Sequence, residues 1–183
     1  MDYKNTENWI LSRVPIFQNK GKVAYNPGLK NVSEFIKELN LPNNQLKFIH
    51  IGGTNGKGST SSYVSSILQE SGYKVGIFSS PHFYDFRERI KINNTKIEKS
   101  FIINFIKKNK KLIKRLGLSF FELSFGLCLD YFNKKKIDYA VIEVGLGGRL
   151  DATNIINPLI SVITNISFDH TDILGNSLKM IAK

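Results

Sequence analysis

The sequence is poor in cysteine, in acidic side chains and in long apolar runs. Because Cys128 is its one cysteine, an internal disulfide is excluded and a zinc site built from cysteines is not expected, which suits a reducing compartment. No stretch approaches the roughly 18 apolar residues of a membrane helix, and the N-terminus lacks the basic and then apolar order of a secretion signal. We therefore expect a cytoplasmic protein without a membrane partner.

Basic side chains outnumber acidic ones, 26 Lys and Arg against 15 Asp and Glu, and the resulting net charge of +11 favours anionic partners. The densest basic cluster, residues 107–115, alternates with apolar residues at helical spacing and has no aromatic side chains among its charges. This pattern predicts the solvated face of a helix, so we expect no nucleic-acid partner. A nucleic-acid-binding protein is the alternative, and its retention of RNA or DNA would depend on these lysines.

Residues 1–183 contain no internal repeat and no linker rich in Pro, Gly or Ser, so we expect one domain. Hydrophobic patterning predicts strands and helices in alternation. The expected strands are 46–51, 74–78, 137–144 and 159–164, and the expected helices are 57–71, 100–116 and 121–134. The nearly continuous apolar runs 139–142 and 160–164 are typical of parallel strands covered on both faces. The sequence thus predicts a three-layer α/β/α sheet.

A glycine-rich segment, residues 52–60, joins a predicted strand to a predicted helix. Glycines let the backbone wrap an anion, N–H groups at a helix start bind phosphate oxygens, and a lysine reaches the terminal phosphates. The candidate nucleotide-binding residues are Gly53, Thr54, Asn55, Gly56, Lys57, Gly58 and Ser59. The usual spacing G-x-x-x-x-G-K-[ST] is not met, because Ile51 stands at the first glycine and Gly58 at the Ser/Thr position, which moves the hydroxyl to Ser59. A glycine turn without a ligand is the alternative.

The segment Gly53–Ser59 resembles the phosphate loop of ATP-dependent amide ligases, a family that includes the peptidoglycan Mur ligases and the folylpolyglutamate/dihydrofolate synthases. Further segments resemble the folate branch of this family, so that the similarity extends over nearly the whole chain. These segments are 24–29, 79–82, 87–90, 143–154 and 168–170. The resemblance implies the P-loop NTPase-like central domain of a Mur ligase, incomplete here, with the smaller Rossmann-like C-terminal domain absent.

By this resemblance, Gly56 to Ser59 would hold the phosphates of ATP, and Lys57, Glu143 and His170 would carry the catalysis. The implied Mg²⁺ ligands are Ser80, Glu143 and His170. Oxygen ligands suit magnesium, whereas histidine is less usual. Glu143 ends a predicted buried strand, where an unpaired carboxylate is costly, and this independently favours a metal or a cationic partner. On the residues alone, Ser80 also fits a turn and His170 a helix start.

By the same resemblance, a pteridine-bearing substrate would contact residues of three segments. These are Pro27, Gly28 and Leu29; Ser119, Phe120, Phe121 and Glu122; and Leu150, Asp151 and Ala152. A flat heterocycle needs apolar walls and a few polar groups at its edge, which Phe120 or Phe121 together with Asp151 can supply. A place in the apolar core is the alternative for Phe121, and we expect Cys128 in the core.

The resemblance implies ATP-driven amide formation, in which the γ-phosphoryl group activates a substrate carboxylate as an acyl phosphate and the amine of L-glutamate displaces the phosphate. The substrates would be dihydropteroate, reduced folates or both, and the enzyme a monomer. Members of the family are considerably longer, and residues 177–183 have the pattern of a helix that stops before about two turns. We therefore expect a truncated chain that, if it is the whole product, binds magnesium-ATP weakly at best and does not turn over. The alternatives are an inactive remnant of such a ligase and a Mur-type ligase for a cell-wall precursor.

Overall fold

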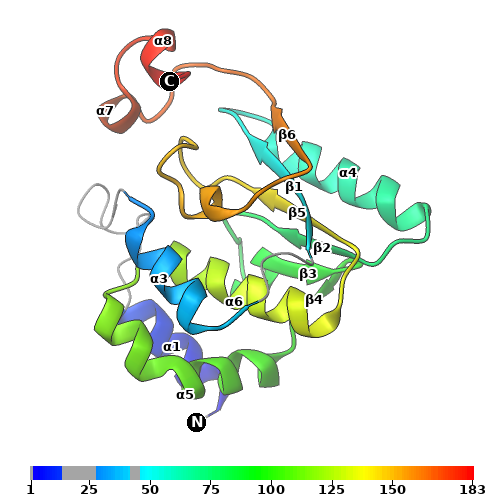
Figure 1. The fold of residues 1–183 in the computed structure, drawn as a ribbon, viewed down its shortest axis with the longest axis vertical. Coiled ribbons are helices and arrows are strands. Elements are labelled where there is room, and N and C mark those ends of the chain that lie inside the picture. Colours follow the sequence, from blue (N-terminus) through cyan, green and yellow to red (C-terminus); the bar gives the residue numbers. More distant parts are fainter. Residues whose placement is uncertain (1, 14–27, 42–45) are drawn as a thin grey trace.

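The computed structural model describes residues 2–13, 28–41 and 46–183. Its centre is a six-stranded sheet with the order β4-β3-β2-β5-β1-β6 (Figure 1). The strands are β1 (Lys47–Gly52), β2 (Val75–Phe78), β3 (Ile90–Ile92), β4 (Thr95–Lys96), β5 (Tyr139–Glu143) and β6 (Ile160–Ile163). β2, β5, β1 and β6 form a parallel array, as the four predicted strands require, and β3 is antiparallel to both β2 and β4.

Helices cover both faces of the sheet, which confirms the predicted three layers (Figure 1). The helices are α1 (Tyr3–Arg13), α3 (Lys30–Glu38), α4 (Lys57–Glu70), α5 (Lys99–Leu116), α6 (Phe120–Lys135), α7 (Thr171–Leu174) and α8 (Leu178–Ile181), with 3-10 turns η2 (Phe86–Arg89) and η3 (Ala152–Ile155). Because side chains alternate along a strand, Ile49 and Ile51 of β1 pack with Val64 and Leu68 of α4, whereas Phe48 joins the core beneath α6. The second face is covered by α6, with α3, α5 and α1 beyond it.

The long helices form where the sequence predicts them, within one residue at the start of α5 and of α6. α6 begins with a capping box, in which the Ser119 hydroxyl accepts from the Glu122 N–H and the Glu122 carboxylate accepts from the Ser119 N–H at 2.7 Å. α5 ends at Gly117, which takes the left-handed φ of 60°. The basic residues of α5 are largely exposed and its apolar residues buried, so the predicted solvated face is confirmed. Cys128 is fully buried in the core, as expected.

Two features of the sheet differ from the sequence prediction. The segment 160–164 was expected to be covered on both faces, and this is wrong: Ile160 is 56 % and Ile163 70 % exposed, because β6 is the edge strand and pairs only with β1 among the described residues. The β3–β4 hairpin was not predicted. Asn93 and Asn94 turn it with φ values of 44° and 62°, the left-handed pair that a two-residue hairpin turn needs.

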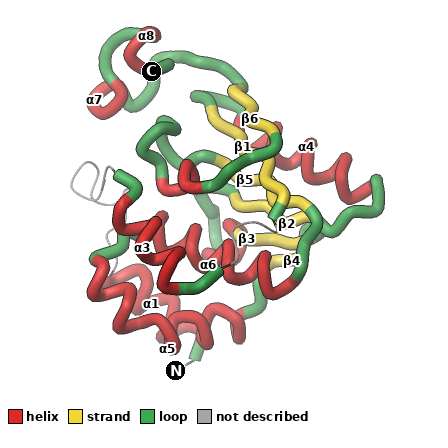
Figure 2. The backbone as a smooth tube through the Cα atoms, viewed as in Figure 1, coloured by secondary structure: helices red, strands yellow, loops and turns green. Residues whose placement is uncertain are grey.

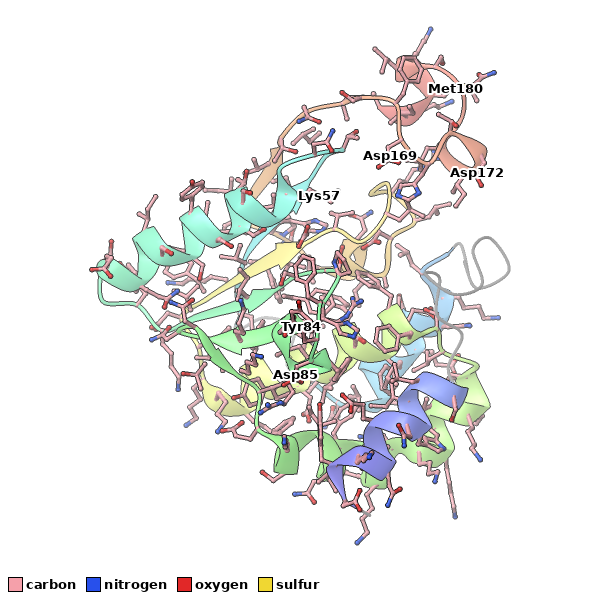
Figure 3. All side chains as sticks on the ribbon, turned by 180° about the vertical axis from the view of Figure 1, so that it is seen from behind. Lys57, Tyr84, Asp85, Asp169, Asp172 and Met180 are labelled. Carbon is pink, nitrogen blue, oxygen red and sulfur yellow. The ribbon has the colours of Figure 1, made fainter. Side chains whose placement is uncertain are left out.

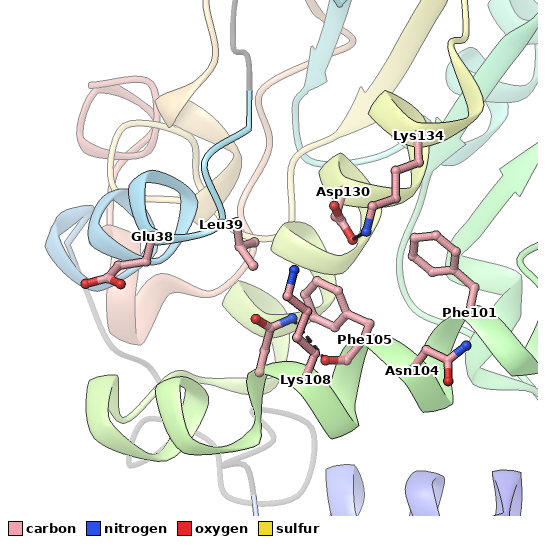
Figure 4. A pocket seen from close by; sticks show the side chains of 9 residues that line it. Glu38, Leu39, Phe101, Asn104, Phe105, Lys108, Asp130 and Lys134 are labelled. Atoms are coloured by element: carbon pink, nitrogen blue, oxygen red, sulfur yellow. Dashed lines mark hydrogen bonds and ion pairs between the residues drawn. The ribbon is translucent and has the colours of Figure 1, made fainter.

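The helical layer encloses a small cavity of about 270 Å³ between α3, α5 and α6 (Figure 4). Part of its polar lining is paired internally: Lys134 lies 2.7 Å from the Asp130 carboxylate, and the Asn109 amide donates to the Phe105 carbonyl oxygen at 3.0 Å. Within the described residues, no helix combines the length and apolar character needed to cross a membrane. Figure 2 shows that the loops after the parallel strands lie together at one end of the sheet. These loops form the candidate site.

Candidate active site at the carboxyl edge of the sheet

The phosphate loop connects β1 to α4 and depends on two glycines. Gly56 caps α4 with a φ of 82°, and Lys57 is the first helical residue, so the N–H groups of the first turn point out of the helix start. Gly53 has a φ of 127°, and a Cβ there would lie 2.1 Å from Thr164 Oγ1. Only glycine therefore fits at position 53 in this conformation. The strand–loop–helix context that the sequence predicted is confirmed.

Residues 164–167, which follow β6, form hydrogen bonds with the phosphate loop, and the sequence did not indicate this contact. The Thr54 and Asn55 N–H groups donate to the carbonyl oxygen and side-chain oxygen of Asn165 at 2.9 and 3.1 Å. The Thr164 hydroxyl donates to the Asn55 carbonyl oxygen at 2.6 Å, and the Ser167 N–H donates to Thr54 Oγ1 at 3.0 Å. These bonds span more than 100 positions of sequence. The loop is thus held in one shape before any anion enters it.

Lys57 turns its ammonium group back over its own loop. Nζ donates to the carbonyl oxygens of Gly53 at 2.8 Å and Thr54 at 3.0 Å. An ammonium group carries three donors, so this arrangement places a positive charge at the loop with donor capacity left for an anion.

Glu143 ends β5 beside the start of α4, where it is 4 % exposed. Its Oε2 accepts from the Ser80 N–H at 3.0 Å, and a Cβ on Gly58 would lie 3.7 and 3.8 Å from its two oxygens. Burial raises the pKa of Glu143, against the opposing effects of the Ser80 N–H, Lys57 and Arg89. A buried carboxylate beside a hydroxyl-bearing residue fits a magnesium ion by its donor chemistry.

The structure brings Ser80 and Glu143 together, as the magnesium hypothesis requires. His170 lies at the N-terminal cap of α7 with a φ of 45°, and its ring is 3.7 Å from the Asp169 carboxylate. It lines a cavity that Gly53 and Lys57 of the phosphate loop also line. The described ranges contain no group of three or more His, Cys, Asp or Glu side chains placed to hold a metal. The role of His170 as a third ligand therefore stays a prediction.

A cavity of about 690 Å³ opens beside the phosphate loop. Gly53, Thr54 and Lys57 line one part of it and the loop 145–150 after β5 another. A third part is lined by residues 169–170, 173–174 and 180–183. In Figure 3, Lys57 at the start of α4 lies below the segment that carries Asp169, Asp172 and Met180. The cavity is large enough for a small organic ligand beside the phosphate loop.

The residues implied for the pteridine lie in neighbouring elements. Pro27 is outside the described residues, Gly28 and Leu29 precede α3, and both α3 and α6 contact η3, which follows Asp151. Of this set, Leu150 lines the large cavity and is 41 % exposed. The ring of Phe121 is partly buried, 5.5 Å from that of Phe78, and covers Gly145 so closely that a Cβ there would lie 2.5 Å from it. Phe121 thus joins the core and borders the loop after β5.

Phe120 and Ala152 are buried, at 4 % and 7 % exposure, and Phe120 belongs to a cluster around Arg89 that the sequence did not reveal. The Arg89 guanidinium is 3 % exposed, lies 4.9 Å above the Phe120 ring, and donates from Nε to His82 Nδ1 at 2.8 Å. Burial lowers its pKa to about 10, against the attraction of Glu143. The sequence placed Arg89 in a family-like segment without a role, and its burial appears only in the fold.

Asp151 is 5 % exposed, and its carboxylate is occupied by the chain itself. Oδ2 accepts from the N–H groups of Gly145 at 3.1 Å and Leu146 at 2.9 Å, and Oδ1 accepts from the N–H and the hydroxyl of Thr153 at 3.0 and 2.5 Å. A carboxylate has about four acceptor sites, so these four bonds use them. Asp151 therefore shapes the loop, and its side chain offers no further acceptor to a pteridine.

Comparisons with known proteins agree with this geometry. Residues 51–183 match the Mur ligase middle domain. The chain is 41% identical over 188 residues to a probable bifunctional folylpolyglutamate synthase/dihydropteroate synthase of Haloferax volcanii, covering 100% of this chain and 22% of the relative. It is 36% identical over 187 residues to the dihydrofolate synthase/folylpolyglutamate synthase of Bacillus subtilis, covering 98% of this chain and 42% of that protein.

A solved structure has the same fold. The chain superposes on E. coli FolC in complex with DHPP and ADP with a TM-score of 0.84 at 32% identity, over 99% of this chain and 42% of that one. The chain thus spans less than half the length of the relatives it matches. The match to the middle domain covers most of the chain and includes the phosphate loop, Ser80 and Glu143. The chain therefore belongs to the Mur ligase family through its middle domain, and its relatives there include folylpolyglutamate and dihydrofolate synthases.

Proposed function

We propose that this chain supplies the ATP- and magnesium-binding part of an ATP-dependent ligase that adds L-glutamate to dihydropteroate, to reduced folates or to both. One observation carries the proposal: the phosphate loop and the buried Glu143 converge on the first turn of α4, where a Cβ on Gly58 would lie 3.7 Å from the Glu143 carboxylate. A phosphate-binding loop beside a buried carboxylate is the arrangement that phosphoryl transfer needs. The cited relatives, which are synthases of this class, support it.

Phosphoryl transfer requires positioning and charge neutralisation more than covalent help from the protein. The N–H groups at the start of α4 bind phosphate oxygens, and Lys57 exchanges a carbonyl partner for the terminal phosphate. Glu143 and Ser80, with His170 as the proposed third ligand, would hold Mg²⁺ at this point. When bound, the ion neutralises charge that develops on the transferred phosphoryl group.

The carboxylate substrate attacks the γ-phosphorus of ATP, the bond to ADP breaks and an acyl phosphate forms. The amine of L-glutamate then attacks the carbonyl carbon of the acyl phosphate and gives up a proton. Phosphate leaves and the amide forms, so no side chain of the protein needs to act as a nucleophile. The pteridine-bearing part would lie against Phe121, Leu150 and the backbone of 150–152, beside the large cavity. Gly28, Leu29 and the Ser119–Glu122 turn would border it from α3 and α6, with Phe120 beneath.

Nucleotide binding by the chain itself tests the first half of this proposal. Isothermal titration with magnesium and a non-hydrolysable ATP analogue is expected to show binding that Lys57→Ala weakens by at least about tenfold, the effect of losing one charged contact to phosphate. Lys107→Ala removes an equal charge from the exposed face of α5 and is expected to change nothing. Equal weakening by both variants would reduce the effect to general electrostatics and overturn the assignment of Lys57.

Thermal melts test the substrate class. Dihydropteroate is expected to raise the melting temperature in the presence of magnesium-nucleotide, because a ligand that binds only the folded state stabilises it. A UDP-linked cell-wall precursor is expected to have no effect. The reverse result would identify a ligase for cell-wall precursors and contradict the folate proposal.

A further inference from the structure

A chain of three buried polar side chains joins β1 to the loop after β5. His50 Nε2 lies 2.8 Å from Thr153 Oγ1, and Thr153 Oγ1 donates to Asp151 Oδ1 at 2.5 Å. The three residues are 7 %, 0 % and 5 % exposed. His50 lies two positions before the glycine loop on β1, whereas Thr153 and Asp151 begin η3, about 100 residues later in the sequence.

Counting donors fixes the direction of each bond. Three N–H groups, which can only donate, converge on the Asp151 carboxylate, so it accepts at both oxygens. Burial raises the pKa of Asp151, but the hydrogen bonds from Thr153, Leu146 and Gly145 oppose this by stabilising the charged carboxylate. With Asp151 ionised, the single hydroxyl proton of Thr153 is directed to Asp151, and Thr153 Oγ1 accepts from His50. His50 is then the tautomer that carries its proton on Nε2 and leaves Nδ1 as an acceptor. Burial lowers the pKa of His50, which agrees with a neutral ring.

This chain of bonds lies at the large cavity. His50 lines the cavity together with Gly53 and Lys57 of the phosphate loop and with residues 145–150. Asp151 holds the first two N–H groups of that second loop, those of Gly145 and Leu146. In the part of the chain that the structure describes, His50 makes no other side-chain hydrogen bond. The His50 ring therefore forms its side-chain hydrogen bond with Thr153.

We propose that His50 is a positioning residue of the substrate site: its Nε2–H orients Thr153, which with Asp151 fixes the loop 145–150 at the wall of the cavity. The inference deepens the proposed function and rests on it for the identity of the substrate. It assigns His50 to the substrate wall rather than to the nucleotide, although His50 lies next to the phosphate loop in the sequence. Losing the bond leaves the loop free to shift, so binding of the pteridine-bearing substrate is expected to suffer and binding of ATP is not.

Paired substitutions separate the hydrogen bond from the packing. In the whole protein as its gene encodes it, His50→Leu removes the bond and Thr153→Val removes it together with the Thr153 bond to Asp151. His50→Gln keeps a donor, and Thr153→Ser keeps a hydroxyl. We expect His50→Leu to raise the KM for the pteridine-bearing substrate about tenfold, the value of one buried hydrogen bond, and Thr153→Val, which loses two, to raise it at least as much. The KM for ATP is expected to stay within about twofold in both. The second pair is expected to stay near the wild type. Thr153→Val replaces only the hydroxyl group by a methyl group of similar size, so it provides the test if His50→Leu does not fold.

Two kinetic results would overturn the inference. One is an equal rise of both KM values, which would mean a general structural role. The other is a His50→Gln protein as impaired as His50→Leu, which would mean that the shape of the ring, and not its proton, is what matters.

A spectroscopic measurement is independent of turnover. Long-range ¹H–¹⁵N spectra of histidine-labelled protein are expected to show His50 protonated on Nε2 and unprotonated on Nδ1 at neutral pH, and His50→Gln identifies its signals among those of the other histidines. A proton on Nδ1 would contradict the donor count and overturn the inference. If the wild type binds no pteridine-bearing substrate, the proposed function fails, and the tautomer still decides whether the His50–Thr153–Asp151 chain exists as argued.

Discussion

Ser80 and Glu143 are joined across 63 positions of sequence by one hydrogen bond, from the Ser80 N–H to Glu143 Oε2 at 3.0 Å. The bond ties the loop after β2 to the end of β5, two neighbouring parallel strands. Neighbouring parallel strands place their carboxyl ends at one edge, which is why residues so distant in sequence share a site. The same geometry sets one Glu143 oxygen in a fixed direction beside the phosphate loop.

Glu143→Gln keeps an oxygen that accepts from Ser80 and removes the charge. We expect it to abolish the increase in nucleotide affinity that magnesium causes, while binding measured in EDTA is retained, because magnesium prefers charged oxygen ligands. Titrations with and without magnesium measure this. Glu70→Gln, an exposed residue at the far end of α4, is the matched control. Retention of the magnesium effect in Glu143→Gln would remove Glu143 from the ligand set.

Gly53→Ala tests the shape of the phosphate loop. The backbone there has a φ of 127° and the added methyl would meet Thr164 Oγ1, so we expect nucleotide binding to be lost and the free energy of unfolding to fall by about 1–3 kcal/mol. Gly148→Ala is the control, since a Cβ at Gly148 meets nothing within 4 Å. Urea denaturation and nucleotide titration of both variants check it. A Gly53→Ala protein that binds nucleotide normally would mean that the Thr164 brace is not needed.

The buried His50 and the half-buried His82 predict how stability depends on pH. Burial lowers the pKa of His50 and of His82 below the ordinary value of 6.5, so the unfolded chain binds protons more readily than the folded chain. Their contribution to stability is therefore complete above about pH 6.5 and is lost as the pH falls through the lower folded pKa. We expect His50→Gln to reduce the fall in unfolding free energy between about pH 7.5 and about pH 5.5.

Urea denaturation at both pH values checks this expectation, with His170→Gln as the control for removal of an exposed imidazole. Equal pH dependence in wild-type and His50→Gln protein would mean that His50 does not contribute to the acid sensitivity of the fold.

Arg89 is expected to contribute to stability through the groups it contacts. Arg89→Lys loses both the Nε bond to His82 and the planar stack on Phe120, so we expect the free energy of unfolding to fall by about 1–3 kcal/mol although the charge is kept. Arg115→Lys, which alters an exposed guanidinium paired with Glu38, is expected to cost less than about 0.5 kcal/mol. Equal effects in denaturation would show that the Arg89 cluster adds nothing beyond a surface ion pair.

Local signals in the sequence predicted the parts of the site that depend on neighbouring residues. Gly56 and Lys57 predict a phosphate loop because such a loop needs a left-handed turn, a helix start and a lysine within a few positions. The apolar run 139–142 predicted a buried parallel strand, which β5 confirms, whereas the same prediction for 160–164 is wrong because β6 is largely exposed. Ser80 and Glu143 were placed together only by a resemblance to a family, and the hydrogen bond between them agrees with that placement.

Hydrogen bonds between residues far apart in the sequence could not be predicted from the sequence. Thr164 and Asn165 look like ordinary residues after a strand, and their role appears only when β6 lies beside β1. From the sequence, Asp151 resembles a substrate ligand because a charged residue can be recognised there. The four groups that donate hydrogen bonds to its carboxylate cannot be recognised from the sequence. The β3–β4 hairpin was within reach, since the pair Asn93-Asn94 after an alternating Ile-Lys-Ile is a strong turn signal.

The open edge of β6 also has a consequence for the behaviour of this chain in solution. Among residues 2–13, 28–41 and 46–183, no strand pairs with the outer side of β6, and Leu159, Ile160 and Ile163 present exposed apolar side chains there. The net charge of +11 opposes contact between two copies. Added salt screens that repulsion, so we expect the 183-residue chain to self-associate as ionic strength rises, and Ile160→Lys to delay it in light scattering. The colloidal stability of the isolated chain thus depends on the balance between attraction at the exposed edge of β6 and repulsion by the net positive charge.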